Sequence, residues 1–407
     1  MTVALPATGK LVEMISDDGE FIPLQNVTEQ NGKLVFDYPM APAGSAMFFV
    51  TDTPAGELPP QTPCDPFAGE KVLELDGNWE LQNHTGNLLT LDRCRYRVDG
   101  GEWQAVDTVS LQRRLLAYQR QCEVDLEFDF DIAEDFDFNS ELKLIIEKPQ
   151  IFKYALNGES FSAQDEGYVF DREFRKLRLP RNLKAGKNTI SLHLTYIQTP
   201  EQYAAVERAK IFESEYNKLN FTTELENIYL MGDFAVRHIG SVTEGTRCSQ
   251  DFHGKFELAA PLKGNSVKPA ELTTYGAPFF SGKIKFGRKF NLSNEAAESV
   301  RFLRCQCDGA NSVRAYINGK VLPVRCWDPF AFDVTGLLQS GENEIAMELT
   351  TSLRNTMGPF HNFAGESYWI STMSFNVEET IHGVQVPPAT ESYNLVKLGL
   401  RDIELSK

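Results

Sequence analysis

The fold of this chain is decided by the stretch IFKYALNG at residues 151–158, which is followed by LKAGKNTI at 183–190. The same two-part pattern returns as VRAYINGK at 313–320 and LLQSGENEI at 337–345. Asn-Gly after alternating apolar and polar residues favours a type I′ hairpin turn, because both residues tolerate positive φ. Gly-x-Asn before such a run indicates a turn into a returning strand. Each copy therefore predicts a hairpin, an excursion, a turn and another strand, which is compatible with a jelly roll.

The two copies start far enough apart for each to be a domain rather than a solenoid repeat. The chain has 407 residues, which is more than one hydrophobic core of ~250–300 residues usually serves. Further half-buried strands are predicted by alternation, as in 125–132, whose carboxylates should form a solvated outer face. Many short strands with little helix predict an all-β fold of two tandem jelly-roll β-sandwiches.

We predict four segments. Residues 1–52 form a short N-terminal β segment, which is either the end of a missing domain or an appendage docked on the first sandwich. Residues 53–69 are rich in proline and form a stiff linker. The first sandwich covers 70–250 and the second covers 251–407. One connecting helix is expected at 200–219, because Thr199 supplies an N-cap and Pro200 suits the first helical position.

Composition excludes several classes of function. The net charge of −17 without a basic stripe argues against a nucleic-acid partner. No stretch approaches the ~20 apolar residues of a membrane span and no leader follows Met1, so we expect a cytoplasmic protein without a membrane partner. Seven scattered cysteines favour reduced thiols over a disulfide framework. The histidines show no metal-binding spacing, and no cofactor is predicted.

The second copy resembles the sugar-binding, galactose-binding-like jelly-roll domains of glycoside hydrolase family two. The resemblance is carried by 313–320, PFAFDVT at 329–335 and the turn that follows. A broader resemblance, from about Leu75 onward, is to the C-terminal region of rhamnosidase-like bacterial glycoside hydrolases. Four stretches carry it: DGNW at 76–79, NLLTLD at 87–92, YLMGDF at 229–234 and LRNTMGPFH at 353–361.

These families place their catalytic residues on a β/α barrel of ~250 residues, and this sequence contains no such alternation. No catalytic residue is therefore carried over. We expect a non-catalytic carbohydrate-binding or accessory region, which holds sugar next to a catalytic hydrolase domain or subunit. The alternative is a structural or assembly module that braces that partner without binding sugar. If the chain hydrolyses glycosides by itself, the best candidates are Glu224, Glu226 and Asp233.

A sugar site needs an aromatic face and planar hydrogen-bonding side chains. In the second copy such residues fall in predicted loops, of which two could converge at one end of the sandwich. The candidate carbohydrate-binding residues are Tyr275, Trp327, Asp328, Arg354, Asn355 and His361.

Overall fold

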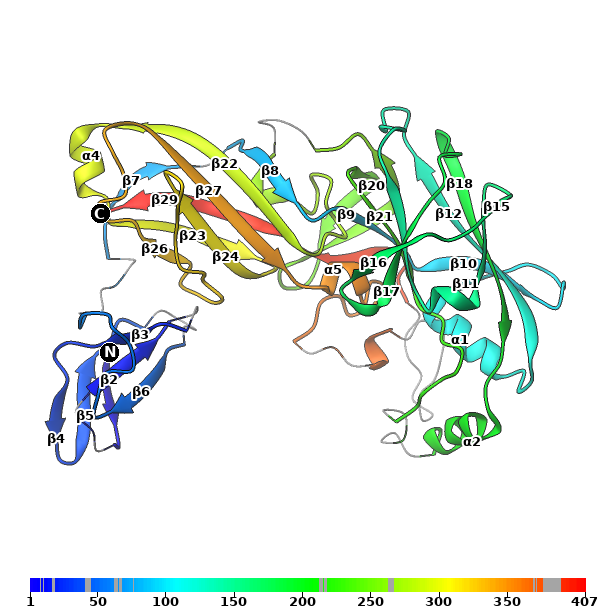
Figure 1. Cartoon of the computed structure of the whole chain (residues 1–407), viewed down its shortest axis with the longest axis horizontal. Helices are drawn as coiled ribbons and strands as arrows, with labels where there is room; N and C mark the ends of the chain where they lie inside the picture. The colour runs from blue at the N-terminus through cyan, green and yellow to red at the C-terminus, as the bar shows by residue number, and fades with distance from the viewer. Residues whose placement is uncertain are drawn as a thin grey trace.

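A computed structural model describes the whole chain except residues 8, 10, 17–18, 41–44, 62–64, 66–67, 76, 212–214, 216–217, 263–266, 369, 371 and 376–388. It confirms the all-β prediction, with antiparallel sheets and short helices. Figure 1 shows two large β units side by side and a smaller N-terminal lobe.

The N-terminal lobe is built from two three-stranded sheets around a small core of its own. Its strands are β1 (Thr2–Leu5), β5 (Lys33–Asp37) and β4 (Thr28–Gln30) in one sheet, and β3 (Phe21–Pro23), β2 (Leu11–Ile15) and β6 (Met47–Thr51) in the other. Val12, Leu34 and Phe36 are buried between them. Part of the predicted linker belongs to this lobe, because the Ala55 amide donates to the buried Glu13 carboxylate and Gln61 forms a bridge with Leu24.

The first sandwich faces a nine-stranded sheet against a five-stranded one. The larger sheet runs β11 (Gln104–Asp107), β10 (Arg93–Val98), β12 (Cys122–Ile132), β18 (Gly186–Tyr196), β14 (Lys153–Leu156) and β15 (Glu159–Phe161), and is extended by β20 (Ala235–Glu244), β21 (Ser249–Ala259) and β28 (Tyr393–Val396). The smaller sheet runs β16 (Asp165–Val169), β17 (Asp171–Arg178), β13 (Leu142–Glu147), β19 (Ile228–Gly232) and β9 (Asn87–Leu91).

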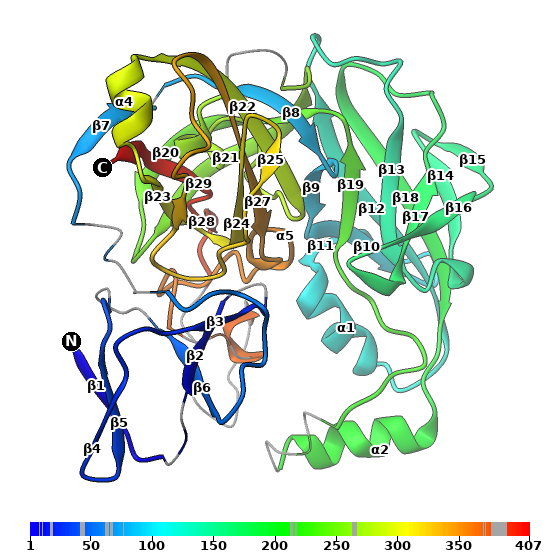
Figure 2. The same cartoon turned by 60° about the vertical axis from the view of Figure 1, so that its left-hand side comes forward.

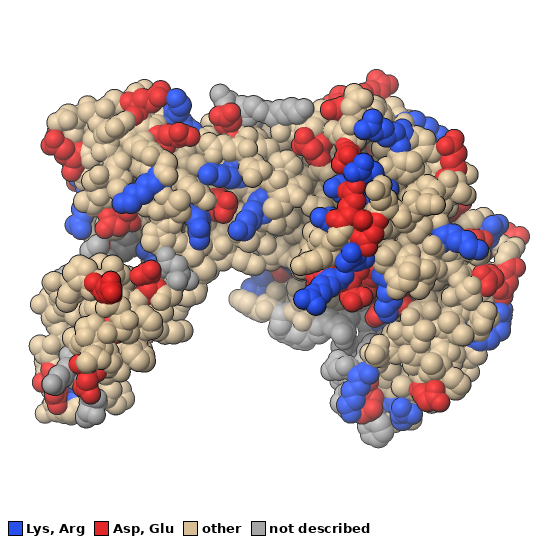
Figure 3. All heavy atoms as spheres, viewed as in Figure 1, with Lys and Arg blue, Asp and Glu red and all other residues tan. Residues whose placement is uncertain are grey.

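The alternation predicted for 125–132 is confirmed, because inward apolar residues on β12 are buried and outward ones are not. The outward carboxylates are not merely solvated, however. Asp125, Glu127 and Asp129 pair with cations on the flanking strands, in the pairs Arg97–Asp125 (2.7 Å), Arg95–Glu127 (2.6 Å) and Lys187–Asp129 (2.8 Å). Figure 3 shows positive and negative side chains similarly interleaved on the visible face.

The second sandwich has a five-stranded and a four-stranded sheet. The first of these runs β25 (Lys320–Val321), β24 (Ala310–Ile317), β27 (Gly341–Thr351), β22 (Lys283–Leu292) and β8 (Glu80–His84). The second runs β26 (Ala331–Asp333), β23 (Phe302–Asp308), β29 (Gly399–Ser406) and β7 (Lys71–Glu74). Trp79, Phe286 and Phe332 are fully buried in its core.

The two sandwiches exchange strands, so their boundaries differ from 70–250 and 251–407. Strands β7 and β8 pair with β29 and β22 and complete the second sandwich. In return, β21 and β28 join the large sheet of the first. Figure 2 shows the chain passing from β8 in one unit to β9 in the other. Composition could not reveal this exchange, because strand pairing depends on partners that lie far away along the chain.

Helices are short and more numerous than the single one predicted. The helix expected at 200–219 is α2 (Pro200–Ala209), with the capping box between Thr199 and Gln202 in place. It ends ten residues early, although part of 210–219 lies outside the described residues. Sequence reasoning missed α1 (Thr108–Leu116), α4 (Asn294–Ser299) and α5 (Arg354–Met357). None of the described helices is long and apolar enough to cross a bilayer.

The repeated motif builds the same side-chain network in both sandwiches. Asn157 Nδ2 donates to Asn188 Oδ1 at 2.9 Å, and Asn318 Nδ2 donates to Asn343 Oδ1 at 2.9 Å. The second asparagine of each pair also accepts from one backbone amide and donates to two carbonyls of its own turn. Asn188 is 0% exposed and Asn343 is 1% exposed. Each pair therefore ties an Asn-Gly hairpin to the turn that opens the next long strand.

Replacing either buried asparagine should destabilise its sandwich. Asn188→Ala or Asn343→Ala would leave several backbone groups without partners, so we expect a loss of about 2–4 kcal/mol in the free energy of unfolding. Urea denaturation measures this loss. The control is Asn291→Ala, because Asn291 is exposed on β22. Equal stability of the three variants would contradict the role given to the asparagine pairs.

Candidate functional site

A pocket of about 310 Å³ opens where two strands of the first sandwich part. Strand β12 pairs with β10 up to Glu127 and with β21 from Asp131 onward. In the register of these described strands, β12 therefore has no neighbour on that side between Phe128 and Phe130. The pocket occupies this fork, and strand β9 of the opposite sheet lines it too. Its volume is at the lower end of the ~300–1,000 Å³ of small-molecule sites.

Two glycines, one on β20 and one on β21, allow a close approach of these two strands beside the fork. Gly254, which lines the pocket, is the register partner of Gly240 in the β20–β21 ladder. A Cβ on Gly240 would lie 1.8 Å from the His253 carbonyl oxygen, and one on Gly254 would lie 2.1 Å from that of Ile239. Both have positive φ, 153° and 131°. Only glycine lets the two backbones approach this closely.

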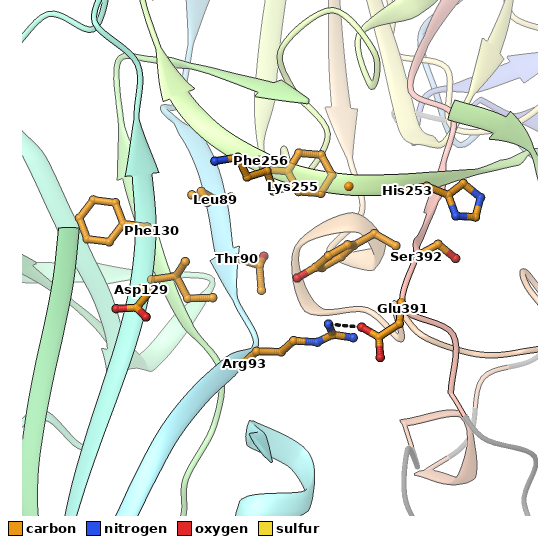
Figure 4. A pocket seen from close by; sticks show the side chains of 13 residues that line it. Leu89, Thr90, Arg93, Asp129, Phe130, His253, Lys255, Phe256, Glu391 and Ser392 are labelled. Atoms are coloured by element: carbon orange, nitrogen blue, oxygen red, sulfur yellow. Dashed lines mark hydrogen bonds and ion pairs between the residues drawn. The ribbon is translucent and has the colours of Figure 1, made fainter. Parts of the chain in front are cut away.

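The pocket combines aromatic walls with a charged rim. Phe130, Phe256 and Tyr393 supply aromatic surface, and the last two rings meet edge to face at 5.3 Å. Arg93 and Glu391 form an ion pair at 2.7 Å and are both exposed. Figure 4 shows this pair, with Asp129 and Phe130 on one side and His253 on the other.

A buried polar triad behind the pocket holds Tyr393 in place. The Tyr393 hydroxyl donates to Asp92 Oδ1 at 2.8 Å, and His361 Nε2 lies 2.9 Å from Asp92 Oδ2. His361 Nδ1 lies 2.9 Å from the Ser392 carbonyl oxygen. Burial alone would raise the pKa of Asp92, but the contacts with His361 and Tyr393 outweigh burial and lower that pKa. Both imidazole nitrogens of His361 therefore face oxygen atoms, and the Asp92 carboxyl is held in its ionised form.

Three of the predicted sugar-contact residues form hydrogen bonds in and beside strand β28, which forms the Tyr393 wall of the pocket. His361 is 7% exposed and Asn355 is 1% exposed. Asn355 exchanges two hydrogen bonds with the Val396 backbone, at 2.7 and 2.9 Å. Arg354 is bound by Glu366 and Asn394. All three residues fix strand β28, which carries Tyr393 to the pocket, and the burial of Asn355 and His361 leaves them no surface for a sugar.

The other predicted contacts lie elsewhere. Trp327, 41% exposed, and the exposed Asp328 are in the loop between β25 and β26 of the second sandwich. Tyr275 is half-buried in the turn after the 3₁₀ helix Pro269–Glu271. The side chains of Arg354 and Asn355 contact Glu366 and strand β28, and α5 contacts β28 and β9. The expected convergence of the two loops is therefore not seen among the described residues.

A second titratable cluster lies at another point of the first sandwich. Glu147, Glu224 and Glu226 border a space of about 10 Å³, which has room for about one water molecule but not for a sugar ring. Desolvation, followed by repulsion from Glu147 and Glu224, raises the pKa of Glu226 to about 7 against the attraction of Lys148. Asp233 is not part of the cluster, because it pairs with His84 at 3.3 Å. The three predicted catalytic candidates thus do not form a substrate site.

The described part of the chain contains no cluster of metal ligands, and the described thiols whose pKa values are raised are protonated at neutral pH. No three His, Cys, Asp or Glu side chains there come close enough together to hold a metal ion. The six described cysteines are free thiols, and Cys64 lies outside the described residues. Burial raises the pKa of Cys94 and of Cys307 to about 12, so these thiols stay protonated and unreactive at neutral pH.

No family model matches the chain, and no curated protein does. Among solved structures, it is similar to a β-D-mannosidase from Dictyoglomus thermophilum, with 12% identity over 65% of this chain and 31% of that one and a TM-score of 0.24. A rhamnosidase from Novosphingobium sp. PP1Y matches with 12% identity over 68% of this chain and 22% of that one, with a TM-score of 0.22. An α-L-rhamnosidase from Streptomyces avermitilis, complexed with L-rhamnose, matches with 10% identity over 85% of this chain and 34% of that one, with a TM-score of 0.23. The chain thus spans about a third or less of these enzymes' length, and likenesses this distant identify no family.

The carboxyl cluster should make stability depend on pH. The folded-state pKa of Glu226, about 7, lies above its ordinary value of 4.5, so the folded protein is penalised as pH rises through 7. Because Glu226 is exposed, solvent screens this penalty, so Glu226→Gln should raise the free energy of unfolding at pH 8 by on the order of 1 kcal/mol and at pH 5 by clearly less. Denaturation of the variant at both pH values checks this, with the exposed Glu102→Gln as control. A gain of the same size at pH 5 would count against the raised pKa.

Proposed function

We propose that this chain is a non-catalytic carbohydrate-binding region that accompanies a glycoside hydrolase catalytic domain or subunit, and that it holds sugar in the pocket at the β12–β21 fork. The observation that carries the proposal is the composition of that pocket. Aromatic surface from Phe256 and Tyr393 lies beside the exposed Arg93–Glu391 pair. Sugars present apolar ring faces and hydroxyl edges, and these two kinds of surface match them.

Preorganisation supports the same function. The Tyr393 hydroxyl donates to Asp92, which is itself bonded to His361, and Phe256 packs on Phe279 at 4.8 Å. An aromatic wall that is already fixed loses little conformational entropy when a ligand binds. The hydrogen bond from Arg93 lowers the pKa of Glu391, the carboxyl at the rim of the pocket. A raised pKa is what a general acid requires, so binding fits the pocket better than hydrolysis.

The alternative is an assembly role, in which the sandwiches brace a catalytic partner and bind no sugar. The two roles predict different behaviour of the purified chain. Screening on an array of plant and bacterial oligosaccharides should return a ligand if the pocket is a sugar site. The array should return none if the role is assembly alone.

Arg93→Ala is the direct test of the pocket. Loss of hydrogen bonds to a charged donor should weaken binding of the array ligand by about 10- to 100-fold. The melting temperature should hardly change, because an exposed ion pair contributes only ~0–1 kcal/mol to stability. Titration calorimetry and thermal unfolding measure both quantities.

Two controls accompany Arg93→Ala. Lys289→Ala removes another exposed ion pair, Lys289–Glu342 at 2.9 Å, from the second sandwich and should leave binding intact. Trp327→Ala tests the loop that the sequence indicated. Loss of binding in Trp327→Ala with unchanged binding in Arg93→Ala would move the site to that loop.

A further inference from the structure

Every Lys, Arg, Asp and Glu side chain that lines the pocket has a partner of opposite charge, and the remaining basic side chain, His253, lies 3.3 Å from the Thr243 hydroxyl through its Nε2. Arg93 pairs with Glu391 at 2.7 Å, Lys255 with Asp131 at 2.6 Å, and Asp129 with Lys187 at 2.8 Å. The pocket therefore offers no uncompensated Lys or Arg cation to an acidic ligand and no uncompensated carboxylate to a basic one. The chain as a whole carries a net charge of −17, which adds a field that repels anions.

The Arg93–Glu391 pair nevertheless keeps hydrogen-bonding capacity. Its contact to Glu391 uses Arg93 Nη1, while a guanidinium has five N–H donors. The Glu391 side chain is 91% exposed, so its carboxylate can accept further hydrogen bonds. The pair thus places donors and acceptors side by side. Two adjacent sugar hydroxyls match this arrangement, because one can accept from the guanidinium while the other donates to the carboxylate.

We propose that the pocket selects uncharged sugars, with the Arg93–Glu391 pair binding two neighbouring hydroxyls, and that it discriminates against uronates and other acidic sugars. This selectivity rests on the proposed function. A uronate carboxylate that accepted from the remaining N–H groups of Arg93 would lie beside the Glu391 carboxylate, which already balances the charge of the arginine. Like charges at such close range are costly. Glu391 therefore acts as the specificity-determining residue, because it already neutralises the charge of Arg93.

Matched sugar pairs test the selectivity. Methyl galactoside and methyl galacturonate, and the corresponding glucose pair, differ only in a CH₂OH or a carboxylate at C6. In calorimetry at low salt, the wild-type chain should bind the neutral member of at least one pair about tenfold or more tightly than its uronate. Glu391→Gln frees the Arg93 charge while keeping a side chain of similar shape, so it should cut that preference by about tenfold or reverse it.

The control is Glu342→Gln, which breaks the Lys289–Glu342 pair on β22 and β27 and should leave the preference unchanged. Equal binding of both members to the wild type would overturn the selectivity while leaving sugar binding in place. So would an unchanged preference in Glu391→Gln. If neither member of either pair binds, and the oligosaccharide array returns no ligand, the proposed function itself fails and the selectivity fails with it.

Discussion

One interaction underlies both sandwiches, namely the hydrogen bond between two asparagine amides that joins a hairpin to the turn opening the next strand. Asn157 and Asn318 stand at φ of 51° and 49°, so each adopts the left-handed conformation that a type I′ turn requires. Each also donates to a buried partner and accepts from the first residues of the returning strand, through Thr189 N and Glu344 N. A buried amide has several groups to satisfy, and this geometry pairs both ends of it. Because β18 and β27 then run through the middle of their sheets, the asparagine pairs fix where the central strands begin.

The strand exchange depends on this framework. With the central strands placed, each sandwich still has open edges, and unpaired edges are a liability. The chain covers an edge of the second sandwich with β7 and β8 before it builds the first, and returns to the first with β28 after building most of the second. The Asn355 side chain makes two hydrogen bonds with the Val396 backbone, as a neighbouring strand would. His361 is hydrogen-bonded to the Ser392 carbonyl oxygen and to the Asp92 carboxylate. The pocket wall formed by β28 thus exists only when both sandwiches are in place.

The sequence predicted what is local and missed what is distant. It predicted the all-β class, the strand alternation on β12 and the Asn-Gly turns, because each is encoded within a few neighbouring residues. It could not predict that Asn157 touches Asn188, or that β8 leaves its neighbours for the other sandwich. The same limit applies to the pocket. Arg93 and Glu391 are separated by 298 positions, and Asp92 and Tyr393 by 301, with no pattern linking them. The sequence predicts hydrogen-bonding capacity for His361 and Asn355, and both use it, but because they are buried their partners belong to the protein itself.

Most of the pocket is lined by strands that meet at the fork, with Glu391 and Ser392 coming from the bend just before β28, and this placement has a physical consequence. Loops usually carry binding residues because they vary and move, whereas side chains on strands are held more firmly by the sheet. Here Phe256 and Tyr393 come from β21 and β28, Asp129 from β12 and Arg93 from β10. Between Phe128 and Phe130 the backbone edge of β12 is free of a registered neighbour, so it too can meet a ligand's hydroxyls. A hydroxyl both donates and accepts, as the missing strand would have done. On the proposed function, a sugar in the fork would take over part of the role of that strand, and a polar, uncharged ligand would suit such a gap in the sheet.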